Sequence, residues 1–152
     1  MLAGGWNLNA IMNLNSGQPL TALSGVDNAR TGAGNQRADI IGDPSLPSGR
    51  SHQDQYTEWL RRAAFAPNGL GTYGNLGRNT FFGPGNASVD LGLMKNFRVK
   101  EHFITQFRFE MFNSLNRVNF NNPTTAQNSA NFWRITSARD PRILQLSLRL
   151  TF

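Results

Sequence analysis

The sequence predicts an all-β fold: a piece of an antiparallel transmembrane β-barrel with about four long strands. Four segments alternate apolar and polar side chains, as strands with one apolar face do. Each runs for about 10 to 12 residues, longer than the usual 5 or 6 of soluble strands but right for a tilted strand that crosses a bilayer. One connection between them is very short and two are very long, which is the layout of outer-membrane barrels.

The first strand is predicted at residues 5–17 and the second at residues 87–99. The apolar face of the first holds Trp6, Leu8, Ala10, Met12 and Leu14. Asparagines dominate its other face. The apolar face of the second holds Val89, Leu91, Leu93, Phe97 and Val99. Lys95 interrupts this face near its end, so a charge is expected where the strand otherwise looks suited to lipid.

The third strand is predicted at residues 102–114 and the fourth at residues 142–152. The third places Phe103, Thr105, Phe107, Phe109 and Met111 on one face. The fourth places Leu144, Leu146, Leu148, Leu150 and Phe152 on one face. The opposite face of each strand carries polar residues in its middle, as expected where a barrel wall meets a polar interior.

The connections give the strands a direction. Residues 18–86 and 115–141 are predicted long loops, apart from a short helix at residues 55–65. Only the few residues around VKEH join the second and third strands. Short turns lie on the periplasmic side of outer-membrane barrels and long loops lie outside, so both long loops are expected outside and the C-terminus inside. Trp6, Phe103 and Phe152 then fall near the periplasmic rim, where barrels carry an aromatic girdle.

Composition narrows the remaining possibilities. The chain has 152 residues, a net charge of +6 and no cysteine, so it has neither disulfides nor thiolate metal ligands. Its cations are scattered, which disfavours nucleic acid as a partner despite the basic balance. No apolar run approaches the length of a membrane-spanning helix. The opening MLAGGWNLN lacks the features of a signal peptide, so the chain is expected to be a piece of a longer protein.

Several blocks, in order, resemble the C-terminal end of TonB-dependent outer-membrane receptors, closest to the large Oar-like group with a carboxypeptidase-regulatory-like domain. The blocks are GGWNLNAIMNLNSGQPLT, GVDNARTGAGNQRADIIGDP, GNLGRNTFFGPGNASVDLGLMKNF, FRFEMFNSLNRVNFNNP and RITSARDPRILQLSLRLTF. The resemblance covers essentially the whole chain. It implies a plugged barrel in the outer membrane that imports a substrate bound from outside, with energy delivered by TonB.

The resemblance also implies partners and a role for the last strand. The partners are outer-membrane lipid, the barrel-assembly machinery, the TonB system through segments that this chain lacks, and an extracellular substrate of unknown identity. The last strand, which ends in an aromatic residue, is the signal that the assembly machinery reads. The residues that match this signal are Leu146, Leu148, Leu150 and Phe152.

Chemistry-bearing residues are sparse, and neither a catalytic site, a metal site nor a cofactor is predicted. Arg108, Glu110 and Arg149 are expected to form a lumen-facing ionic network against the plug. The GxGxxG pattern at residues 69–74 lacks the flanking strand and helix of a dinucleotide site and is interpreted as a glycine-rich loop. Oxygen ligands that could suit Ca²⁺ stand at Asp27, Asn28, Asp39 and Asp43, but their spacing matches no ordered ligand loop. His52 and His102 are isolated from each other.

Two alternatives remain open at this point. A passive porin-like barrel would need no plug, so the presence of an upstream plug would discriminate it from a receptor. A small soluble basic β-protein that binds nucleic acid would show the same alternation, and its binding would weaken steeply with salt.

Overall fold

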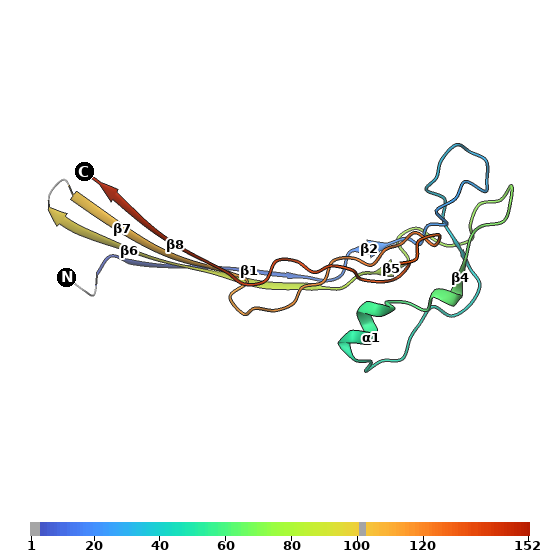
Figure 1. Cartoon of the computed structure of the whole chain (residues 1–152), viewed down its shortest axis with the longest axis horizontal. Helices are drawn as coiled ribbons and strands as arrows, with labels where there is room; N and C mark the ends of the chain where they lie inside the picture. Colours follow the sequence, from blue (N-terminus) through green and yellow to red (C-terminus); the bar gives the residue numbers. More distant parts are fainter. Residues whose placement is uncertain (1–3, 101–102) are drawn as a thin grey trace. The chain divides into compact units, whose positions relative to one another are not determined.

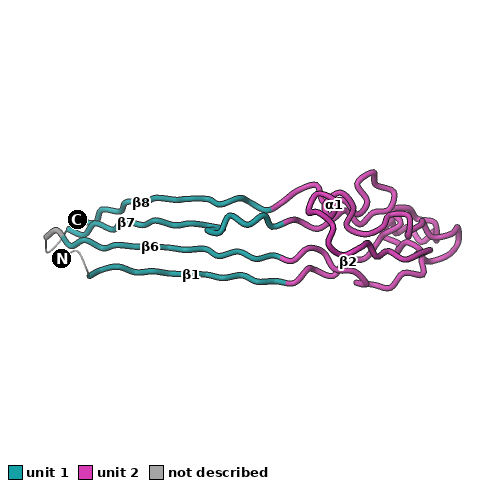
Figure 2. The backbone as a smooth tube through the Cα atoms, turned by 90° about the horizontal axis from the view of Figure 1, so that it is seen from below, with its two compact units in different colours: residues 1–15, 86–119, 139–152 teal, residues 16–85, 120–138 magenta. Residues whose placement is uncertain are grey.

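The computed structural model describes residues 4–100 and 103–152, which divide into two compact units. Unit 1 comprises Met1–Asn15, Asn86–Asn119 and Arg139–Phe152, and unit 2 comprises Ser16–Gly85 and Phe120–Ala138 (Figure 2). Each unit therefore draws on segments that are far apart in the sequence.

Unit 1 is built on one four-stranded antiparallel sheet, in the order β1-β6-β7-β8 (Figures 1 and 2). The strands are β1 (Trp6–Asn15), β6 (Asn86–Lys100), β7 (Phe103–Phe112) and β8 (Ile143–Thr151). The prediction of an all-β, antiparallel fold with four long strands is confirmed.

The strand ends differ from the predicted ones by a few residues. β7 ends at Phe112 rather than at residue 114, because Asn113 turns the chain out of the strand with a φ of 48°. β1 ends at Asn15 rather than at residue 17. The pairing of β6 with β7 shifts register between Arg98 and Lys100. His102 and the side chain of Val99 lie outside the described residues.

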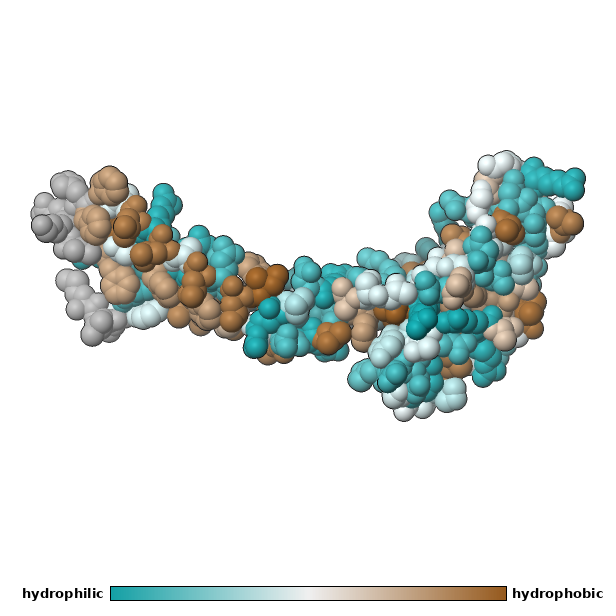
Figure 3. Space-filling model, viewed as in Figure 1, coloured by the Kyte–Doolittle hydropathy of each residue, from teal (hydrophilic) through white to brown (hydrophobic). Residues whose placement is uncertain are grey.

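The register sorts the side chains of all four strands onto the same two faces. Leu8 pairs with Leu93, Leu93 with Phe109, and Phe109 with Leu146. Partners in an antiparallel pair point to the same side of the sheet. One row below, Asn9 pairs with Gly92, which pairs with Glu110. The apolar residues of every strand therefore form one continuous face, and the mostly polar residues form the other (Figure 3).

Unit 2 contains short elements held together by a buried aromatic core. Its two-residue strands pair as β2 (Pro19–Leu20) with β5 (Phe81–Phe82) and β3 (Asp39–Ile40) with β4 (Phe65–Ala66). Trp133 is fully buried, and its ring lies 5.6 Å from that of Phe65 and 5.4 Å from that of Phe132. Segments predicted only as long loops thus pack into a core, because aromatic rings spaced widely along the chain meet in it.

The helix predicted at residues 55–65 is wrong in position and length. The structure has α1 (His52–Thr57) and a separate one-turn 3-10 helix, η1 (Arg62–Ala64). Ser51 starts α1 early, since its hydroxyl accepts the Asp54 amide at 3.1 Å. Glu58 ends α1 in an extended conformation, and the next residue donates its amide to Trp133. Among residues 4–100 and 103–152, no helix is long and apolar enough to span a membrane.

Candidate functional site: the two faces of the sheet

The apolar face of the sheet leaves large hydrophobic side chains uncovered. Leu8 is 73% exposed, Leu146 is 68% exposed and Leu148 is 65% exposed. Leu8 lies on β1 and the other two leucines lie on β8, at opposite edges of the sheet. Leu93 and Phe109 connect Leu8 to Leu146 in one cross-strand row, so the exposed surface is a continuous band rather than scattered residues. A contiguous apolar surface of this extent marks contact with a membrane or a partner.

Lys95 stands on this apolar face without exposing its charge. It is 1% exposed, and its Nζ lies 4.8 Å from the ring centre of Trp6 and 5.4 Å from that of Phe97. The ammonium also donates to the carbonyl of Gly4. Contacts with aromatic faces stabilise a cation more strongly when water is excluded. The predicted interruption of the apolar face is therefore a covered cation between two rings.

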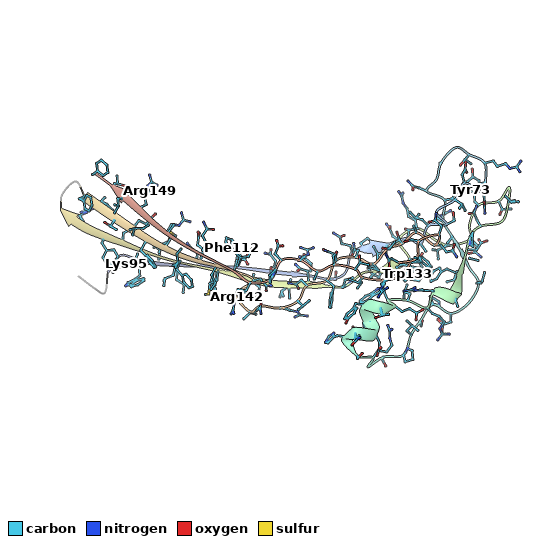
Figure 4. The ribbon with its side chains drawn as sticks, viewed as in Figure 1. Tyr73, Lys95, Phe112, Trp133, Arg142 and Arg149 are labelled. Atoms are coloured by element: carbon cyan, nitrogen blue, oxygen red, sulfur yellow. The ribbon has the colours of Figure 1, made fainter. Side chains whose placement is uncertain are left out.

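The opposite face holds a shallow depression of about 540 Å³. Its floor is Gly92, which has no side chain, and Asn9 and Glu110 flank it in the same cross-strand row. Ile11, Asp90 and Phe112 also line it, and Ile11 pairs in register with Asp90. Figure 4 shows Phe112 and Arg149 on this side of the sheet, and Lys95 and Arg142 on the other.

Arg108 and Glu110 form an ion pair at the depression. Arg108 Nη2 donates to Glu110 Oε1 at 2.7 Å. Arg149 also lies on the polar face, where it pairs in register with Gln106. Within the described residues it takes no part in the ion pair, so the predicted three-residue network contains two residues. Nε of Arg108 is buried and has no acceptor in that part of the chain, which is rare for a buried donor.

The carboxylates of Asp39 and Asp43, which were considered as Ca²⁺ ligands, accept hydrogen bonds from backbone amides. Asp39 accepts the Asn75 amide at 2.8 Å, and Asp43 accepts the Ser45 amide at 2.9 Å. The Ser45 amide also holds the pKa of Asp43 below its ordinary value. Within the described residues, no three acidic or histidine side chains cluster in a way that could hold a metal ion.

The glycine-rich stretch at residues 69–74 serves the packing of unit 2. The Gly71 amide donates to the carbonyl of Asn28 at 2.7 Å, and Gly71 has a φ of 74°. A Cβ at Gly74 would collide with the Arg37 carbonyl. No helix follows this stretch in unit 2, so it lacks the strand–turn–helix of a dinucleotide site.

Asp27 organises a tight loop in unit 2. Its carboxylate accepts the Thr31 amide at 3.0 Å and the Gly32 amide at 2.7 Å. The Thr31 amide, and after it the Gly32 amide and the side chains of Thr31 and Gln36, hold the pKa of Asp27 below its ordinary value against the opposing effect of desolvation. The ionised carboxylate is therefore the form that the folded loop favours.

The Asp27 loop is expected to loosen in acid. A folded pKa below the unfolded one gives a stabilisation that is fully present above the unfolded value of about 3.8 and lost as the pH falls through the folded value. Hydrogen-exchange protection of the Thr31 and Gly32 amides should therefore fall in that acid range. The Gly83 amide, which donates to the Gln18 carbonyl, should keep its protection there. Equal pH dependence at all three amides would contradict this role for Asp27.

The fold and its two faces define the class of the protein. A sheet of long antiparallel strands with one exposed apolar face and one polar face is the wall of a transmembrane β-barrel. The family model described as outer membrane beta barrel domain matches residues 1–145, and the chain belongs to this family. Its place is the cell outer membrane. No curated protein and no solved structure matches the chain.

Sequence reasoning missed the depression. Gly92 looked like one small residue in an alternating strand, and only the register brings Asn9 and Glu110 beside it. The signal that could have found it is the polar face itself. Ile11, Phe112 and Ile143 interrupt that face with apolar side chains, and Phe112 pairs in register with Ile143.

Proposed function

We propose that this chain is the C-terminal part of the barrel of a TonB-dependent receptor, close to the Oar-like group. Such a receptor binds a substrate outside through its loops and plug, and admits it when TonB pulls on the plug. The chain supplies four strands of the wall and no catalytic residue. The observation that carries the proposal is the sorting of all four strands into one apolar and one polar face, together with the resemblance of the whole chain to this group.

The polar face suits the wall against which a plug packs. The Arg108–Glu110 pair, the Gly92 depression and the unsatisfied Nε of Arg108 leave both space and hydrogen-bonding capacity for a polar partner in the lumen. A plug would supply acceptors there. Arg149, two rows further along, adds a positive charge to the same wall.

β8 suits the strand that closes the barrel and that the assembly machinery reads. Leu146, Leu148 and Leu150 lie on its apolar face, and Phe152 after its end is 95% exposed. The outer edges of β1 and β8 pair with no strand in the described part of the chain. Unpaired backbone groups in hydrocarbon cost several kcal/mol each, so further strands of the complete barrel would complete these edges.

A passive porin-like barrel is the second candidate, because the fold family alone does not require a plug. A soluble protein that binds nucleic acid does not fit this family, which resides in the outer membrane. The substrate is left open among ferric chelates, vitamins, glycans and peptides, because its contacts would belong to loops and a plug.

A liposome swelling assay separates the two candidates without knowledge of the substrate. The complete protein is purified, reconstituted into liposomes and exposed to a small sugar such as arabinose. A plugged receptor is expected to give the slow swelling of empty liposomes, because the plug blocks diffusion. A porin would give rapid swelling, and that result would overturn the proposal. A known porin reconstituted in parallel shows that the assay responds.

A further inference from the structure

A turn and a neighbouring segment form an exposed cationic cluster at one end of the sheet. The turn is Asn113–Asn119, which follows β7, and the segment is Arg139–Arg142, which precedes β8. The cationic cluster contains three exposed arginines: Arg117, Arg139 and Arg142. Only one acidic residue, Asp140, lies within these two stretches.

Hydrogen bonds that asparagine oxygens accept hold the two stretches of the cationic cluster together. Asn116 Oδ1 accepts the Arg142 amide at 3.1 Å, and Asn113 Oδ1 accepts the Arg117 amide at 3.1 Å. The Arg139 amide donates to the Asn119 carbonyl at 2.7 Å. The backbone of each arginine is thus fixed, although its guanidinium is free to reach toward solvent or lipid.

The cationic cluster lies on the same side of the sheet as the apolar face and adjoins it. By strand alternation Arg142 falls on the same side as Leu144, and Figure 4 places it with Lys95, opposite Phe112. The orange turn lies on this side too (Figure 1). Leu115 in the turn is 71% exposed and Val118 is 62% exposed. Apolar and cationic side chains therefore meet at the edge of the lipid-facing band.

We infer that this cationic cluster binds a phosphate-bearing lipid headgroup of the outer leaflet. The inference rests on the orientation in the proposed function, in which the ends of the strands that carry the long segments face outward. Arginine matches phosphate with paired N–H donors. Leu115 and Val118 would contact the first carbons of the acyl chains below the phosphates. The surface is continuous with the band that contacts lipid, so a lipid fits it better than a soluble anion does.

The test uses the complete protein in mild detergent and native mass spectrometry with a bisphosphorylated lipid A, with phosphatidylcholine as a neutral comparison. The variant R117Q/R139Q/R142Q is matched by R30Q/R78Q/R134Q, three exposed arginines of unit 2. Each arginine near an anionic headgroup contributes about fivefold to binding. The first variant is therefore expected to bind the phosphorylated lipid at least about tenfold more weakly. The control variant should match the unchanged protein, and binding of phosphatidylcholine should not change.

Unchanged binding by the first variant, or an equal loss in the control, would overturn the inference. So would complete displacement of the lipid by excess inorganic phosphate, since the ligand would then be the free anion. If the triple variant does not assemble, the single change R142Q is measured instead, with an expected loss of about fivefold. The two proposals can fail separately. Slow swelling of the liposomes, together with lipid binding that the arginine changes do not affect, would refute this inference and leave the proposed receptor function supported.

Discussion

Replacing Leu148 by Asp is expected to lower the outer-membrane level of the complete protein by about tenfold or more. Leu148 is 65% exposed on the apolar face of β8 and pairs with Phe107. The change removes the roughly 1.5 to 3 kcal/mol that a large apolar side chain contributes on leaving water. It also places a carboxylate in hydrocarbon, on the strand proposed as the assembly signal. Quantitative immunoblots of outer-membrane fractions measure the effect.

The neighbouring position supplies the control. Ser147 lies on the polar face of β8 and pairs with Arg108, so Ser147→Asn keeps a polar side chain toward the lumen. This variant should reach the outer membrane at the level of the unchanged protein. Equal levels for Leu148→Asp and Ser147→Asn would show that the faces of β8 are assigned wrongly.

Replacing Trp133 by Ala is expected to open unit 2. Trp133 is fully buried and contacts the rings of Phe65, Phe81 and Phe132. Removal of a buried tryptophan costs about 3 to 5 kcal/mol. Because Nε1 of Trp133 has no hydrogen-bond acceptor among residues 4–100 and 103–152, the expected loss is one of packing. Limited proteolysis on intact cells should cleave residues 16–85 roughly 100-fold faster, since cleavage follows the population of the open form.

Tyr73→Ala is the matched change, because Tyr73 is an aromatic residue of the same unit that is 71% exposed. Its cleavage rate should stay close to that of the unchanged protein. Barrel assembly, followed by the heat-dependent mobility of the protein in gels, should be normal in both variants. Similar protease resistance of the Trp133→Ala variant and the unchanged protein would mean that the aromatic core does not hold unit 2 together.

The strands and their faces could be predicted because side chains alternate between the two faces of a strand. A difference in environment between the faces therefore gives a sequence pattern that repeats every two residues. Leu144 to Leu150 alternate so regularly that the face of each residue follows from its position alone. Register then aligned the four apolar faces, and one misaligned strand would have exposed polar groups to lipid. The short connection at VKEH also made the pairing of β6 with β7 foreseeable, since sequential strands usually pair.

Unit 2 could not be predicted in the same way because its core has no local pattern. Trp133 meets Phe65 across 68 positions of chain, and neither residue sits in a periodic segment. The helix prediction failed for a related reason, since the apolar spacing of Tyr56 and Leu60 extends beyond Glu58, where α1 already ends. The burial of Lys95 also depends on a contact with Trp6 on another strand.

The central claim is that the polar face of the sheet lines an aqueous lumen while the apolar face meets lipid. The chain contains no cysteine, so single cysteines can be placed along β8 at Gln145, Leu146, Ser147, Leu148 and Arg149 once any cysteine elsewhere in the complete protein is replaced by serine. With the complete protein in outer membranes, a water-soluble maleimide should react at residues 145, 147 and 149 and spare residues 146 and 148. Uniform labelling, or labelling of residues 146 and 148 instead, would contradict the claim.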